Sequence, residues 1–254
     1  MSRILVTGST DGLGLAAARQ LLEDGHQVIA HARNRVRSDE VRNALPGLLA
    51  VAIGDAASLE DVRSISRQVN DAGGVDAIIH NVGVGYREPR RIETIDGHAH
   101  VFQINVLAPY LLTALIPAKR LVWLSSGLNR QGDPSIRDHD WTARQWNGYQ
   151  AYCDSKLFDA TLAMALARTC PDVASNALEP GWVATRMGGA GAPDDLALAH
   201  VTQVWLAEAS DPKAAGTGGY YFHQNPATPQ PAIHDIRFQD ELVDLCAQLT
   251  GSRL

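Results

Sequence analysis

Short apolar runs alternate with longer amphipathic stretches along almost the whole of this chain. The apolar runs predict buried strands at residues 4–6, 27–30, 48–53, 77–80, 121–124, 173–178 and 218–222. The amphipathic stretches predict helices at residues 13–24, 59–71, 149–168 and 235–249, with Ser58 as an N-terminal cap and Gly25 as a stop. Because parallel strands need a crossover connection, this alternation predicts a doubly wound α/β fold. We expect a parallel sheet of about seven strands with helices on both faces.

Length and composition narrow the class of protein. A chain of 254 residues is long enough for one large domain, and no linker interrupts it, so we expect a single domain over residues 1–254. The net charge of −6 argues against a nucleic-acid partner. No apolar run approaches the roughly 20 residues of a membrane span. The chain enters its first strand without a targeting signal, so a cytoplasmic location is expected.

The cysteines and histidines predict no metal or disulfide framework. Cys153, Cys170 and Cys246 are odd in number and far apart, which favours free thiols. The nine histidines include no H-E-x-x-H pattern, and solvated or capping roles fit them better than metal binding.

A glycine-rich turn lies where the first strand should pass into the first helix. Its spacing, G-x-x-x-G-x-G, lets the backbone approach a pyrophosphate closely, and the helix start behind it offers free N–H groups. The alternative is a tight strand–helix connection with no ligand. The residues that we expect to contact a cofactor here are Gly8, Ser9, Thr10, Gly12, Leu13 and Gly14.

The end of the second predicted strand indicates which nicotinamide cofactor is preferred. An acidic residue at this place would bind the ribose hydroxyls of NAD. Here Arg33 and Asn34 follow the strand, and the first acids come only at Asp39 and Glu40. The planar fork of an arginine suits a 2′-phosphate, so NADP(H) is expected in preference to NAD(H). The alternative is that the arginines here form a solvated loop.

Tyr152 and Lys156 form the most informative pair. Four residues apart on a helix, they lie on one face and can converge on one site. A phenol with an ordinary pKa near about 10 is a poor base at neutral pH, and a nearby ammonium lowers that pKa. Taken alone, the spacing is common enough to be a surface helix pair.

Four further elements occur around this pair in a fixed order. Ser126 follows the strand at residues 121–124, at the end where α/β sheets bind their ligands. Residues 80–83 (His-Asn-Val-Gly) follow the fourth strand, Asn105 lies in the next helix, and residues 180–185 begin with Pro-Gly. Each has an ordinary alternative as a strand end, a turn or a buried polar residue.

Together these elements resemble the short-chain dehydrogenase/reductase family from about Arg3 to Phe222. The resemblance implies a Rossmann fold and a catalytic set of Ser126, Tyr152, Lys156 and Asn105. In that set Tyr152 exchanges the proton, Ser126 orients the carbonyl, Lys156 binds the nicotinamide ribose, and Asn105 supports Lys156 and a relay water. The further cofactor contacts that it implies are Arg33, Asn34, Asp55, Ala56, Asn81, Val82, Gly83, Tyr152, Lys156, Pro180, Gly181, Val183 and Thr185. For Asp55, a turn or cap is the alternative.

Several departures from the family pattern bear on substrate and assembly. Twenty-five residues separate Ser126 from Tyr152, and this insertion, about residues 127–148, resembles the retinol dehydrogenase and protochlorophyllide-reductase-like branch, which acts largely on bulky apolar substrates. Trp141, Trp146 and Trp182 could line an apolar pocket or pack against the core. Residues 184–200 are expected to form the substrate loop. His80 and Val82 replace the residues that the family usually has after the fourth strand. The helix that holds Asn105 is also short, and because this helix normally contributes to the family's dimer contact, a homo-oligomer through it is in doubt.

The expected function is that of an NADP(H)-dependent oxidoreductase. It would transfer a hydride between nicotinamide and a small-molecule carbonyl or secondary alcohol, with Tyr152 as acid/base. One alternative is a regulatory protein that senses NADP(H) without turnover. An epimerase or dehydratase with tightly held NAD fits less well, because it would favour an acid where Arg33 stands.

Overall fold

The strands form one sheet, and their order in the sheet differs from their order in the sequence. The computed structural model describes residues 1–208 and 211–254, and its sheet has the order β3-β2-β1-β4-β5-β6-β7-β8. The strands are β1 (Arg3–Val6), β2 (Gln27–Ala32), β3 (Ala50–Ile53), β4 (Ala77–His80), β5 (Arg120–Leu124), β6 (Ala174–Leu178), β7 (Tyr220–Phe222) and β8 (Asn225–Pro226). All neighbours pair in parallel except β7 and β8. The predicted doubly wound fold is confirmed, and its switch point lies between β1 and β4.

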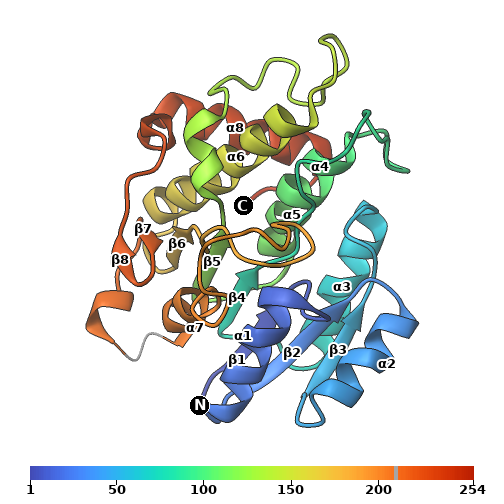
Figure 1. Ribbon diagram of the computed structural model, residues 1–254, viewed down its shortest axis with the longest axis vertical. Helices are drawn as coiled ribbons and strands as arrows, with labels where there is room; N and C mark the ends of the chain where they lie inside the picture. Colours follow the sequence, from blue (N-terminus) through green and yellow to red (C-terminus); the bar gives the residue numbers. More distant parts are fainter. Residues whose placement is uncertain (209–210) are drawn as a thin grey trace.

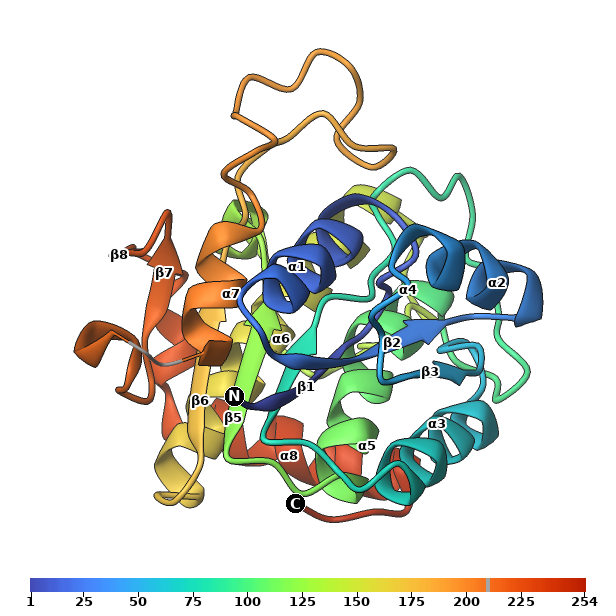
Figure 2. The same ribbon diagram turned by 90° about the horizontal axis from the view of Figure 1, so that it is seen from below.

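Helices cover both faces of the sheet (Figures 1 and 2). The helices are α1 (Gly12–Glu23), α2 (Arg35–Ala44), α3 (Leu59–Asp71), α4 (His100–Phe102), α5 (Ala108–Leu115), α6 (Gly148–Thr169), α7 (Val201–Glu208) and α8 (Ile236–Thr250). Helices α1, α2 and α7 pack on one face, and α3, α5 and α6 pack on the other. Alternate strand residues enter these two cores: Ile4 and Val6 face α1, while Leu5 faces the opposite core.

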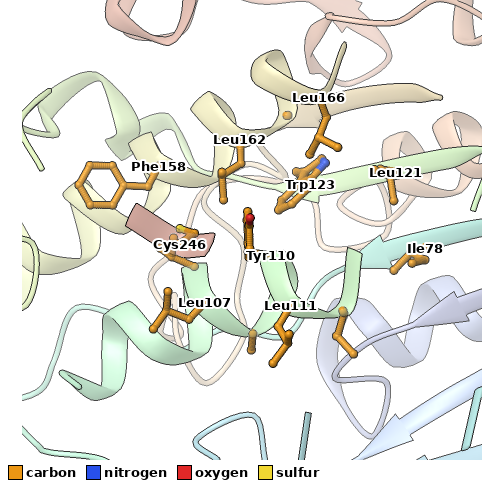
Figure 3. Packing of buried hydrophobic residues seen from close by; sticks show 14 of the residues in the cluster. Ile78, Leu107, Tyr110, Leu111, Leu121, Trp123, Phe158, Leu162, Leu166 and Cys246 are labelled. Atoms are coloured by element: carbon orange, nitrogen blue, oxygen red, sulfur yellow. The ribbon is translucent and has the colours of Figure 1, made fainter. Parts of the chain in front are cut away.

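Large side chains fill the second core beneath β5 (Figure 3). Trp123 is fully buried, and its indole N–H donates to Ser175 Oγ at 3.1 Å. His80 stacks on Trp123 with ring centroids 4.4 Å apart, and its Nε2 lies 2.9 Å from Thr113 Oγ1. Burial lowers the pKa of His80 to about 3, so the imidazole is neutral. The histidine that departs from the family pattern is therefore a packing residue.

Helix α6 is enclosed by the chain's own C-terminal helix. Every residue from Ala151 to Leu166 is buried, which is unusual for a helix at the outside of a sheet. Phe238, Leu242 and Cys246 of α8 belong to the same core as α6. An assembly through the outer face of α6 would therefore have to displace α8.

Three elements differ from the sequence prediction. Helix α2 lies where no helix was predicted and where a solvated loop was the alternative for the arginines. Asn34 caps it by accepting from Arg37 N–H at 3.0 Å, and only Ser38 and Val41 are buried. Strand β8 lies in a proline-rich segment where no strand was predicted, at the edge of the sheet where a proline costs no ladder bond. It raises the strand count from the expected seven to eight. Helix α7 was not predicted, because its side chains are apolar without a clear face.

Short irregular helices complete the chain. Residues Gln103–Leu107 (η1) form a π-helical turn between α4 and α5. The 3₁₀ turns are η2 (Gly127–Gln131), η3 (Pro212–Ala214) and η4 (Pro231–His234). Because π-helical turns occur often at functional sites, the position of η1 indicates that the region around Asn105 is a candidate functional site.

Candidate active site

The glycine turn closes tightly against the strand ends around it. Gly8 has φ of +64° and Gly12 has φ of +53°, a region that side chains disfavour. A Cβ on residue 14 would overlap the Gly8 carbonyl oxygen and the Asn81 amide nitrogen. Helix α1 starts at Gly12 after Asp11, whose side chain makes no cap hydrogen bond. The first N–H groups of α1 therefore lie open to an anion.

Residues after β4 hold this turn from the side. The Asn81 side-chain amide donates to the Thr7 and Gly8 carbonyls at 2.8 and 3.1 Å. The Thr7 hydroxyl in turn accepts from the backbone N–H groups of Asn81 and Val82. Asn81 thus braces the backbone of the turn, and Val82 lies directly beneath Gly8.

His31 ties three strand ends together, a role that the sequence did not reveal. Its Nδ1 accepts from Gly8 N–H at 3.0 Å, and its Nε2 lies 2.9 Å from the Gly54 carbonyl oxygen. Burial lowers the pKa of His31, so the ring is neutral with its proton on Nε2. The imidazole therefore fixes the turn after β1 to the residue that follows β3.

The arginines after β2 have different environments. Arg33 is exposed at the carboxyl end of β2. Arg37, one turn into α2, donates to Thr10 Oγ1 at 2.8 Å and to the Asp11 carboxylate at 2.7 Å. Arg37 therefore offsets the charge of Asp11 beside the open helix start.

Asn34 and Asp55 are partly engaged in local caps. The Asn34 side chain is the cap of α2, and the Asp55 carboxylate accepts from Ala57 N–H at 2.9 Å. Ala56, between Asp55 and Ala57, is buried. The turn expected as the alternative for Asp55 is therefore present, and its second carboxylate oxygen has no hydrogen bond among the described residues.

Tyr152 and Ser126 meet at the carboxyl end of β5. Tyr152 is on the first turns of α6, and Ser126 caps η2 by accepting from Leu128 N–H at 3.2 Å. Burial raises the pKa of the Tyr152 phenol, while the Lys156 charge and the nearby Ser126 hydroxyl act to lower it. The Lys156 ammonium lies 5.8 Å from the centre of the Tyr152 ring. These three predicted residues are brought together.

Lys156 has two buried acceptors, of which one was not predicted. Its ammonium donates to the Leu124 carbonyl at 2.8 Å and to Asp159 Oδ2 at 2.7 Å. Burial alone would lower the pKa of Lys156, but Asp159 and Tyr152 raise it, so the group is charged. Asp159 is one turn further along α6, and the signal in the sequence was an acid among apolar helix residues.

Asn105 lies in the π-helical turn and clamps the chain after β4. Its Oδ1 accepts from Val84 N–H at 2.8 Å, and its Nδ2 donates to the Val84 carbonyl at 3.1 Å and to Ser155 Oγ at 2.9 Å. A Cβ on Gly83 would lie 3.3 Å from Asn105 Oδ1 and 3.7 Å from Lys156 Nζ. Gly83 therefore separates Asn105 from Lys156 and leaves room between them.

The chain after β6 turns back over these residues. Gly181 has φ of +88°, and the Asp194 carboxylate accepts from Trp182 N–H at 2.6 Å. Pro180 and Thr185 flank this turn, and Val183 forms a bridge with Asp194. The segment projects beyond the body of the molecule in Figure 2. Near its tip, Met187 approaches Gly85 so closely that a Cβ there would lie 2.7 Å from Met187 Cγ.

The tryptophans of the insertion are held by packing, and Trp146 also borders a surface hollow beside Glu88 and Pro89. Trp141 is buried, packs edge-on against Trp146 with centroids 5.6 Å apart, and carries the Arg144 guanidinium 3.6 Å above its ring. Trp146 donates from its indole N–H to the Glu88 carbonyl at 2.9 Å. Trp182 is 56% exposed. Packing, the second of the two expectations, holds for Trp141 and Trp146.

A tyrosine from the chain after β4 lies beside Tyr152. The Tyr86 ring is edge-on to Tyr152 with centroids 5.7 Å apart, and edge-on to Tyr149 with centroids 6.1 Å apart. Tyr149 is 40% exposed, so this row of three rings runs from the buried phenol to the surface. Nothing in the sequence pattern singled out Tyr86.

Comparison with known proteins identifies the family. Residues 2–127 match the model of the short chain dehydrogenase family. The chain is 39% identical to the short-chain dehydrogenase chry4 of Gibberella zeae over 100% of this chain and 99% of that protein. The chain belongs to the short-chain dehydrogenase family. It is therefore an oxidoreductase by family.

Two further relatives refine this placement. Mouse retinol dehydrogenase 14 is 31% identical over 73% of this chain and 62% of its own length, which agrees with the predicted branch. The NADPH-bound carbonyl reductase from chicken fatty liver has the same fold, with a TM-score of 0.67 and 21% identity over 89% of this chain and 98% of that one. No helix in the described part of this short-chain dehydrogenase is both long and apolar enough to cross a membrane.

Proposed function

We propose that this short-chain dehydrogenase transfers a hydride between NADP(H) and a carbonyl or secondary alcohol, with Tyr152 as the acid/base. The observation that carries the proposal is the convergence of Tyr152, Ser126 and Lys156 beside a glycine turn at the same edge of the sheet. In α/β sheets this edge, at the switch point, is where ligands bind.

The three side chains divide the chemistry between them. The nicotinamide, when bound, supplies or accepts the hydride. Tyr152 gives its phenolic proton to the carbonyl oxygen, and Ser126 donates a hydrogen bond to that same oxygen. Lys156 donates to the ribose and keeps a positive charge near Tyr152. Because burial raises the pKa of Tyr152, the residue holds its proton at neutral pH and is ready to act as an acid, which favours reduction.

The residues present fit a nicotinamide dinucleotide. The open N–H groups at the start of α1 and the glycine-only turn suit a pyrophosphate. The exposed side chain of Arg33, at the end of β2, suits a 2′-phosphate. The carboxylate oxygen of Asp55 that does not bind Ala57 N–H can accept a hydrogen bond from the adenine amine. Asn34, Ala56, Pro180, Gly181, Val183 and Thr185 complete the proposed contacts, along with the turn residues and Asn81, Val82 and Gly83.

Arg33→Ala tests the cofactor preference. We expect it to weaken NADPH binding by about 10–100-fold and to leave NADH binding nearly unchanged, since an arginine–phosphate contact is charge-assisted. Fluorescence titration of the purified protein with each cofactor measures both constants. Arg35→Ala, one residue into α2, is the matched control and should change neither. NADH binding as tight as NADPH in the wild type would refute the preference.

The same region supports a bulky, apolar or aromatic substrate. Tyr86 and Tyr149 form an aromatic wall that leads to Tyr152, and Met187 closes over Gly85. Flat aromatic walls bind planar apolar groups over a large area. Retinol dehydrogenase 14, named for a long apolar alcohol, is among the relatives.

Tyr86→Ala tests this assignment. We expect KM to rise about tenfold for a bulky aryl ketone and to change little for a small aliphatic ketone, because only the large substrate reaches the wall. Steady-state kinetics with both ketones provide the comparison, and Ile95→Ala on the exposed surface is the control. An equal rise in KM for both ketones would show that Tyr86 acts on Tyr152 and not on the substrate.

A sensing protein without turnover is the second candidate, and its support is weaker. Such a protein would need the cofactor site alone, whereas Ser126, Tyr152, Lys156 and Asn105 are all retained here.

The three free cysteines fit the proposed cytoplasmic location, where thiols stay reduced.

A further inference from the structure

Among the residues that the structure describes, Asp159 is the one buried acid that contacts Lys156. Its side chain is 5% exposed, as is typical only of paired or functional acids, and its Oδ2 accepts from the Lys156 ammonium at 2.7 Å. Its Oδ1 is buried and has no hydrogen-bond partner among residues 1–208 and 211–254. A carboxylate with one oxygen unsatisfied is costly to bury, so stability alone gives no reason for it.

The pair leaves Lys156 with one free donor. An ammonium has three N–H groups, of which the Leu124 carbonyl and Asp159 take two. The third remains for a ligand on the side of Gly83, whose Cβ would lie 3.7 Å from Nζ. The carboxylate therefore selects one orientation of the ammonium out of the several that a flexible lysine could adopt.

The same carboxylate weakens the action of Lys156 on Tyr152. A lone ammonium near a phenol stabilises the phenolate, whereas an ammonium bound to a carboxylate presents little net charge. In agreement, Lys156 lowers the pKa of Tyr152 and Asp159 raises it. The Asp159 carboxyl itself has its pKa raised to about 6 by burial, against the lowering effect of Lys156.

Few other charges reach this position. Lys156 and Tyr152 face it from α6, and the neutral Cys246 thiol faces it from α8, with Tyr110 of α5 beyond Cys246 (Figure 3). Strand β5 offers only the Leu124 carbonyl. Two charged groups on elements around α6 are paired elsewhere: Arg130 of η2 binds Glu179, and His100 of α4 binds Glu88. His234 of η4 is not buried, and neither are the ionisable residues of α8 other than Cys246.

We propose that Asp159 is a positioning residue for the proton transfer. It orients Lys156 toward the cofactor and offsets the Lys156 charge, so that Tyr152 keeps its proton and works as an acid in carbonyl reduction. This inference rests on the proposed function and adds a residue that sets the pH range in which Tyr152 holds its proton.

The variant Asp159→Asn tests this positioning role, because its amide oxygen is still an acceptor for Lys156 and the substitution removes only the negative charge. Ultraviolet titration of phenolate absorbance, taken as the difference between each protein and its Tyr152→Phe partner, isolates Tyr152 without any turnover. We expect the Tyr152 midpoint to fall by about one pH unit in Asp159→Asn, in the range of single-charge effects. Asp159→Glu should restore the wild-type midpoint. An unchanged or higher midpoint in Asp159→Asn overturns the proposal.

Kinetics give a second readout. The pH profile of kcat/KM for alcohol oxidation, which needs the phenolate, should shift to lower pH by about one unit, so oxidation below the inflection becomes about tenfold faster. Asp154→Asn is the matched control, since Asp154 is equally buried on α6 but binds Arg144. Its profile should not move. A loss of rate with no shift would make Asp159 merely structural and overturn the proposal.

The two proposals fail in distinguishable ways. If neither the wild type nor any variant oxidises or reduces a substrate, the proposed function falls, and the phenolate titration still decides the role of Asp159. If Asp159→Asn does not fold, as judged by circular dichroism, Asp159→Ser gives a smaller neutral side chain for the same measurement.

Discussion

Replacing Tyr152 with phenylalanine is expected to lower kcat by about 10²–10⁴-fold, the range in which one positioned acid/base contributes. The substitution removes only the phenolic oxygen, so the ring still fills its buried place beside Tyr86 and Lys156. NADPH binding should therefore change by less than about threefold. Steady-state kinetics and fluorescence titration on the same preparation measure the two quantities.

The matched control is Tyr149→Phe, which removes a hydroxyl from the neighbouring, partly exposed ring on the same helix. That hydroxyl donates to the Gln131 side-chain oxygen at 3.1 Å, so turnover should be retained. Turnover in Tyr152→Phe equal to that of the wild type would exclude Tyr152 from the reaction. Loss of NADPH binding together with turnover would mean that the ring, and not the proton, matters.

The proposed catalytic residues could be found in the sequence because their order along the chain resembles that of the family. Helical spacing places Tyr152 and Lys156 on one face, and Ser126 follows a strand end, but only the resemblance to the family joined the three into one site. The doubly wound parallel sheet followed from the alternation of strands and helices, whereas the order of its strands was not predicted. These relations depend on the chain nearby, and the structure agrees with them.

Residues whose roles depend on distant strands could not be predicted. His31 is one polar residue in an apolar strand, and its two hydrogen bonds exist only because β1 and β3 flank β2. Asp159 has the spacing of an ordinary surface ion pair with Lys156, and it becomes a buried acid only because α8 covers α6. Tertiary packing decides burial in both cases, and the local signal is limited to one polar residue among apolar neighbours.

The charged and aromatic segments each left two alternatives open, and the sequence alone could not decide between them. The residues of α2 are so polar that a solvated loop was the alternative for its arginines, yet the Asn34 cap and two buried side chains suffice to form a helix. Trp141 and Trp146 suggested a pocket, although in the folded insertion they pack on each other and on Arg144. Large aromatic rings serve a core and a binding site equally well, so composition alone cannot separate the two.

Gly14→Ala is expected to weaken NADPH binding by at least about 10–100-fold, because overpacking costs about 1–3 kcal/mol. The new methyl would overlap the Gly8 carbonyl oxygen and the Asn81 amide, and both are held by hydrogen bonds that resist movement. Alanine favours helices over glycine by only about 0.5–1 kcal/mol, which does not offset the clash. The melting temperature should also fall by several degrees, at about 2–4 °C per kcal/mol.

The control for Gly14→Ala is a glycine in open space. A Cβ on Gly216 would meet no atom within 4 Å, so Gly216→Ala should leave both NADPH affinity and melting temperature within error. Fluorescence titration and thermal unfolding compare the two variants. Weakened binding with an unchanged melting temperature would mean that the new methyl group clashes with the cofactor and not with the protein. Wild-type binding and stability in Gly14→Ala would instead mean that the turn relaxes freely, and that its glycines are not needed to bring the backbone close to a pyrophosphate.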